Sequence, residues 1–208
     1  MPDAPDGLRV QVYNEDGTNN ILNVAPEGDI VRMRTGEHSL LLYNNDTEYI
    51  VFDDMNSFAS AKATTRTRTR ASYAGNPYME NTVENTVNAP DMLYGNYIEN
   101  YTAERKIEAD ELPVTMHPLV FTYLVRYEFS HGLEYVALAR GALAGMAGAV
   151  WLNNGRTSEE AATILYDCTV EDFGAQAASI RSAYRTIRTS TTLHGLPNAN
   201  MPCNLKYA

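Results

Sequence analysis

Hydrophobic and polar residues alternate most regularly in residues 118–130. Every second position from Leu119 to Phe129 is apolar, and this spacing predicts one long β-strand, because successive side chains of a strand point to opposite faces. The other face turns polar only at Arg126 and Glu128. We expect the C-terminal half of the chain to supply the sheet that covers the apolar face. That predicted inner face consists of Leu119, Phe121, Tyr123, Val125, Tyr127 and Phe129.

Shorter apolar runs separated by turn residues precede this strand. The first run, residues 8–13, alternates with Leu8, Val10 and Val12 facing inward, and Gly17 supplies the positive φ of the turn that follows. Strands spaced by 8–12 residues, with turn signals between them, are typical of a sandwich or barrel. The pattern predicts strands near residues 8–13, 21–24, 30–34, 39–43 and 48–52, and the continuous run 39–43 is typical of a central strand.

The composition changes in residues 76–101, which are rich in asparagine and contain a tandem Glu-Asn-Thr-Val. We interpret this stretch as an inter-domain junction with little core of its own. It divides the chain into an N-terminal β-sandwich, residues 1–88, and a C-terminal β-sandwich, residues 89–208.

The second half gives weaker signals. Residues 134–151 are rich in alanine and glycine, and we interpret them as two short strands, about 133–139 and 147–152, joined by a connection of small residues. Residues 161–170 predict a strand with Ala162, Ile164, Tyr166 and Cys168 on one face, and residues 177–188 are considered for another. The tail, residues 189–208, has weak periodicity and offers no clear strand.

Composition excludes several classes of protein. The chain has 208 residues, of which 44% are hydrophobic and 20% charged, so it is globular. Its net charge of −10 argues against nucleic acid and against an anionic membrane surface as partners. Its 14 tyrosines suit a secreted or surface β-protein of a bacterium. Residues 1–6 show no signal-peptide pattern, which leaves a cytosolic protein or a mature form as alternatives.

One basic stretch interrupts the acidic chain. In residues 64–70 the alternation places Arg66, Arg68 and Arg70 on one face of a strand and threonines on the other. A solvated edge whose charges prevent strand pairing is favoured over a nucleic-acid-binding arm. A site for an arginine-specific protease is a third alternative.

No catalytic or metal-binding motif is present. The four histidines lack metal spacing, and the nucleophile elbow, the phosphate-binding loop and the dinucleotide fingerprint are all missing. We therefore expect no enzyme activity, no cofactor and no metal. Cys168 and Cys203 could form one disulfide or stay apart.

Several short motifs resemble a known family. They lie at residues 89–95, 118–126, 133–136, 139–148 and 162–167. Together they resemble the Bacteroidales surface lipoproteins related to fimbrial anchors and minor pilins, the Mfa2/FimB-like group. The resemblance implies an all-β chain of two tandem Greek-key, transthyretin-like β-sandwich domains. It also implies attachment to the outer membrane through a lipid on an N-terminal cysteine, which this sequence does not contain.

Two functions follow as expectations. The resemblance implies a non-enzymatic fimbrium anchor, assembly or adhesion subunit that contacts other fimbrial or pilin subunits through strand edges. The alternative is a carbohydrate- or peptide-binding module on the cell surface, with surface glycans as partners. Its stacking surface would be Tyr94, Tyr97 and Tyr101.

Overall fold

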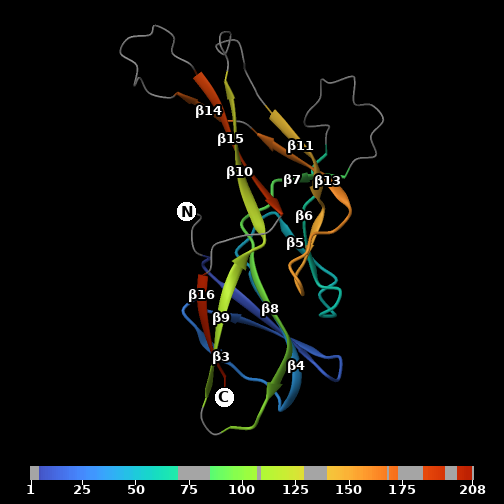
Figure 1. Cartoon of the computed structure of the whole chain (residues 1–208), viewed down its shortest axis with the longest axis vertical. Helices are drawn as coiled ribbons and strands as arrows, with labels where there is room; N and C mark the ends of the chain where they lie inside the picture. Colours follow the sequence, from blue (N-terminus) through green and yellow to red (C-terminus); the bar gives the residue numbers. More distant parts are fainter. Residues whose placement is uncertain are drawn as a thin grey trace.

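Every regular element that the computed structural model describes is a β-strand (Figure 1). The expected all-β class is therefore confirmed. The structure describes residues 5–69, 85–106, 109–128, 140–167, 169–172, 185–194 and 201–207.

The largest sheet has seven strands in the order β2-β1-β4-β8-β9-β16-β3. Its members lie together in the lower half of Figure 1, apart from the smaller sheets. They are β1 (Leu8–Asn14), β2 (Asn19–Val24), β3 (Asp29–Val31), β4 (Gly36–Asn44), β8 (Tyr94–Ala103), β9 (Asp110–Pro118) and β16 (Met201–Tyr207).

The other three sheets have three strands each; two lie in the upper half of the view, and the one with β5 and β6 lies near its middle (Figure 1). The first has the order β10 (Val120–Glu128), β15 (Arg185–His194) and β14 (Thr169–Asp172). The second has the order β11 (Arg140–Ala147), β13 (Ala161–Asp167) and β7 (Thr86–Asn88). The third has the order β12 (Ala149–Trp151), β6 (Lys62–Thr65) and β5 (Ile50–Asp53).

The seven-stranded sheet folds over on itself to make a sandwich. β8 and β9 pair only where Tyr94 opposes Pro118 and Gly95 opposes His117, whereas β1 and β4 pair along their length. One buried cluster joins side chains of β1 and β4 to Val114 and Met116 of β9. The two parts of the sheet therefore face each other across a common core, and the predicted sandwich packing is confirmed.

The centre of this sheet is buried on both faces. Leu40 and Leu42 of β4 face the sandwich core, whereas Leu41 and Tyr43 face a second cluster. Leu41 is 0% exposed and packs in the same cluster as Ala63 and Val150 from the third small sheet. The continuous run of apolar residues in β4 is explained by this double burial, since neither face meets water.

Several predictions for the first 52 residues are confirmed. Leu8, Val10 and Val12 are buried, and β1 forms a hairpin with β2 through a turn in which Gly17 has a φ of 80°. Gly17 N–H donates to the carbonyl of Asn14 at 3.0 Å and closes that turn.

The prediction of a strand at residues 118–130 is wrong about its buried apolar face. The chain ends β9 at Pro118 and begins β10 at Val120, so it leaves one sheet and enters another. Leu119 and Val120 are both buried at this crossing, but Tyr123 is 52% exposed. The predicted apolar face is therefore not buried along its whole length. Leu119 and Val120 pack in the second cluster, whereas Tyr123 is exposed to solvent. Phe129 lies outside the described residues.

The interpretation of the asparagine-rich stretch as a junction with little core is wrong for residues 94–101. They belong to β8, which pairs with β4 inside the large sheet, and Tyr94 joins its core. Strands from both sides of residue 88 share three of the four sheets, so two tandem domains divided there are not confirmed. Residues 76–84 lie outside the described residues.

Two expectations for the C-terminal half are also wrong. The small-residue connection contains β11, in which Gly141 opposes Tyr166 of β13. The ring of Tyr166 fills the space where a Cβ of residue 141 would lie, so the glycine is suited to its strand. The tail, expected to lack clear strands, contributes most of β15 and all of β16. Cys168 lies outside the described residues, so its pairing with Cys203 stays open.

Candidate functional site

The three tyrosines that sequence reasoning singled out do not lie together on one surface. Tyr94 is 5% exposed in the sandwich core, where burial raises the pKa of its hydroxyl. Tyr101 packs against the same core. Only Tyr97, at 42%, is well exposed. A stacking surface built from all three therefore does not form.

The arginine segment is more constrained than a solvated edge. Arg68 N–H donates to the carbonyl of Thr86, and the Arg68 guanidinium donates to Asp167 Oδ2 at 2.8 Å. Arg66 is exposed, although its carbonyl accepts from Asn88 N–H. Arg70 lies outside the described residues. The proposed protease sensitivity of this segment stays a prediction.

Strand edges are the surfaces most relevant to assembly. β2 and β3 end the large sheet, and each carries a large exposed apolar side chain, Ile21 at 54% and Ile30 at 56%. β3 has three residues and begins with Asp29, whereas β2 has six residues and no charge. Natural sheets protect their edges with short strands, charges, prolines or bulges, and β2 has none of these.

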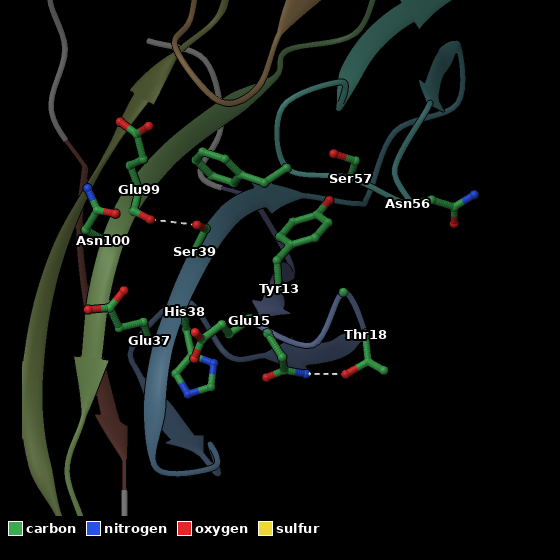
Figure 2. Close-up of a pocket in the computed structure, with 13 residues that line it drawn as sticks. Tyr13, Glu15, Thr18, Glu37, His38, Ser39, Asn56, Ser57, Glu99 and Asn100 are labelled. Carbon is green, nitrogen blue, oxygen red and sulfur yellow. Dashed lines mark hydrogen bonds between the residues drawn. The ribbon is translucent and has the colours of Figure 1, made fainter.

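A cavity of about 400 Å³ lies beside the turn between β1 and β2. We call it the His38 cavity. Glu37, His38 and Ser39 of β4 and Glu99 and Asn100 of β8 are among its lining residues (Figure 2). The β4–β8 register shifts here, since His38 pairs with Tyr101 but Leu40 pairs with Ile98. This bulge brings Glu99 and Asn100 to the cavity, as bulges commonly re-aim side chains at binding sites.

An aromatic wall closes another side of the His38 cavity. Tyr13 and Phe58 meet edge to face, with ring centroids 5.9 Å apart. The Tyr13 hydroxyl donates to the carbonyl of Met55 at 2.9 Å. Burial, and then the proximity of Tyr43, raise the pKa of Tyr13 far above its usual value, so the hydroxyl stays protonated.

Two buried acceptors of this cavity lack hydrogen-bond partners. His38 is 5% exposed and its Nε2 donates to the carbonyl of Arg34 at 2.7 Å, which leaves Nδ1 as an unpaired acceptor. The Asn14 amide nitrogen donates to Thr18 Oγ1 at 2.8 Å, which leaves Asn14 Oδ1 buried and unpaired. Thr18 Oγ1 donates in turn to Asp16, and this fixes the orientation of the Asn14 amide. The same contacts to Thr18 hold the pKa of Asp16 below its usual value.

A smaller cavity of about 230 Å³ lies where β8 and β9 meet. Tyr97, His117 and Pro118 line one side, and Leu152 and Asn154 line the other. The exposed side chain of Tyr97 therefore borders a hollow.

The described residues contain no group of three His, Cys, Asp or Glu side chains placed to hold a metal ion. Within the same residues, no helix has the length and apolarity needed to cross a membrane.

Sequence reasoning missed the His38 cavity for a physical reason. Its residues come from β1, β4, β8 and the loop after β5, and only folding brings them together. The pair Glu37-His38 at the start of a strand is the local signal that could have directed attention there.

These features define a class of protein: an all-β chain of packed sheets with an uncharged strand edge. The chain belongs to the family described as a domain of unknown function, DUF5119, whose model matches residues 1–167.

A curated relative supports the resemblance to fimbrial anchors. It is a Bacteroides ovatus protein named as a fimbrium anchoring subunit, Fim4B, and it is 29% identical over 157 residues. The match covers 73% of this chain and 44% of that relative. The recognition of a Bacteroidales fimbrial-anchor-like protein is thereby confirmed.

Solved structures named as adhesins share the fold. One from Bacteroides ovatus is 22% identical with a TM-score of 0.70, and the match covers 95% of this chain and 63% of that chain. One from Bacteroides thetaiotaomicron is 11% identical with a TM-score of 0.50, covering 94% and 65%. This chain thus spans less than half of the curated relative and under two thirds of each solved chain.

Proposed function

We propose that this chain belongs to a non-enzymatic cell-surface subunit that anchors or assembles a fimbrium. The name of the Bacteroides ovatus relative and the fold shared with the adhesins support this role. The observation that carries it is the edge of β2, six uncharged residues long with Ile21 exposed.

The contact with a neighbouring subunit is strand addition at β2. An edge strand presents unpaired backbone N–H and C=O groups, and an extended segment of another chain pairs with them. Backbone hydrogen bonds supply affinity in this mode, while exposed side chains such as Ile21 supply specificity.

We further propose that the native protein is an outer-membrane lipoprotein facing outward. The acidic net charge of −10 is unsuited to binding an anionic leaflet by charge alone, so a covalent lipid is the more suitable anchor. Metabolic labelling of the native protein with a fatty-acid analogue tests this. Surface-exposed protein without label would contradict the lipid anchor.

The strand-edge role is tested by Ile21→Lys in the bacterium that encodes the chain. A charge on an edge strand opposes pairing, so we expect fimbriae to be lost from cells and recovered in the culture medium. Ile30→Lys is the matched control, because Ile30 is equally exposed on a three-residue edge. Cell-bound fimbriae in both variants would show that β2 is not the contact.

Carbohydrate binding is the second candidate, and Tyr97 beside the 230 Å³ cavity favours it. A glycan array should show a ligand that Tyr97→Ala loses and Tyr123→Ala keeps. Tyr123 is equally exposed but does not line the cavity. A ligand retained by both variants would contradict binding at Tyr97.

A further inference from the structure

We propose that the His38 cavity binds a guanidinium group, carried either by an arginine side chain of a partner protein or by a small free molecule. This proposal does not depend on a fimbrial role. It follows from the chemistry of the atoms that line the cavity.

Two side chains that line the cavity each leave a buried acceptor without a partner. The carbonyl of Arg34 can only accept, so Nε2 of His38 carries the proton and Nδ1 presents a lone pair. Thr18 donates its hydroxyl proton to Asp16, so Asn14 must turn its NH₂ to Thr18 and its Oδ1 away. Both leftover atoms are buried acceptors, and a buried acceptor that no donor reaches destabilises the fold.

The charged side chains of the lining are all acidic, beside the neutral Asn56, Ser57 and Asn100. Glu15, Glu37 and Glu99 contribute three carboxylates, and no lysine or arginine lines the cavity. The hydroxyls of Tyr13 and Ser39 already donate to carbonyls, the latter to that of Glu99 at 2.6 Å. The three carboxylates would repel an anionic ligand and attract a cation.

Arg34 lies beside the His38 cavity without lining it. It lines the adjacent cavity with His38 and donates to Asp16 at 3.2 Å. Glu15 and Glu37 line that adjacent cavity too, but the hydrogen bond of the Arg34 guanidinium is to Asp16, and Glu99 lies outside that cavity.

Among donor-rich groups, guanidinium fits best. It has five N–H donors in a plane and keeps its charge at any physiological pH. It also stacks on aromatic rings, which the Tyr13–Phe58 wall provides. The volume of about 400 Å³ falls within the usual range of small-molecule sites.

Calorimetric titration of the full chain with three probes tests the proposal. Acetyl-arginine amide should bind at least about tenfold more tightly than acetyl-citrulline amide, its neutral analogue, because a charge-assisted contact of about 1.4 kcal/mol corresponds to that ratio. Acetyl-lysine amide should fall between them. Equal affinity for the arginine and citrulline probes would overturn the proposal.

Variants locate the binding. The double variant Glu37→Gln with Glu99→Gln should weaken acetyl-arginine amide by about five- to tenfold, since each exposed ion pair contributes up to about 1 kcal/mol. Glu27→Gln, an exposed carboxylate outside the cavity, should leave the affinity unchanged. If the double variant and Glu27→Gln lost the same affinity for acetyl-arginine amide, the binding site would lie elsewhere and the assignment would be overturned.

Nuclear magnetic resonance of the His38 imidazole gives a readout that does not depend on affinity. In free protein the nitrogen shifts should report a proton on Nε2 and a bare Nδ1, and saturating acetyl-arginine amide should shift Nδ1 toward a hydrogen-bonded value. An unchanged Nδ1 resonance at saturation would contradict the proposed contact.

Titration with agmatine and with a Gly-Arg-Gly peptide distinguishes the two sources of the guanidinium group. Binding of the peptide indicates a protein side chain, and binding of agmatine alone indicates a small free guanidinium compound.

Discussion

Replacing Leu41 by alanine tests the double burial of β4. Leu41 is 0% exposed and points to the cluster between the large sheet and the third small sheet, away from the sandwich core. Removing the isopropyl part of its side chain loses transfer free energy and leaves a cavity, which together lower the free energy of unfolding by about 2–5 kcal/mol. Leu42→Ala, on the other face at 1% exposed, should cost a similar amount.

The measurement is equilibrium unfolding in urea, followed by far-ultraviolet circular dichroism and by the fluorescence of Trp151. Trp151 is the one tryptophan of the chain and lies in β12, beside the cluster that contains Leu41. Ile21→Ala, at an exposed position, is the control and should cost below about 0.5 kcal/mol. If Leu41→Ala cost under about 1 kcal/mol while Leu42→Ala cost about 3 kcal/mol, only one face of β4 would be buried and the reasoning would be refuted.

Three further predictions concern local contacts. Gly141→Ala should destabilise the chain by about 1–3 kcal/mol because the new methyl group meets the Tyr166 ring, and adding Tyr166→Ala should make the glycine substitution nearly neutral in a double-mutant cycle. Asn44→Ala should cost about 2–3 kcal/mol in the same urea assay, because this buried amide accepts from Tyr94 N–H at 2.7 Å and donates to the carbonyl of Met92. The pKa of the Asp16 carboxyl is lowered in the folded chain, so its ionised form stabilises the fold. This contribution to stability is fully present above the unfolded pKa of the carboxyl and is lost as pH falls through the lower folded pKa. Acid titration by magnetic resonance should therefore show the Thr18 amide signal moving below about pH 4, and Asp16→Asn should abolish that movement.

The sequence predicted local elements well where the turn chemistry was explicit. The β1–β2 hairpin follows from the alternation of Leu8 to Val12 and from the glycine turn, both of which are properties of neighbouring residues. The buried run in β4 was likewise correctly assigned to a central strand.

The sequence did not predict which distant strands pair. Alternation identifies a strand but carries no information about its partner, so the placement of β8 beside β4 was missed. β11 was missed because glycine and alanine weaken a strand signal, and only the cross-strand ring of Tyr166 shows why Gly141 is suitable. The His38 cavity depends on a bulge at the β4–β8 pairing, and no motif in the sequence marks that bulge.

The position of β16 has a consequence for how the chain folds. β16 pairs with β9 and, through Leu205 to Tyr207, with β3, whose residues lie near the other end of the chain. Contacts between such distant segments require a large loop to close before they yield any stabilisation, which slows folding. The large sheet therefore cannot be completed while residues 201–207 are still being synthesised. We expect this chain to stay incompletely folded until synthesis has passed β16, a state compatible with transport across a membrane before folding.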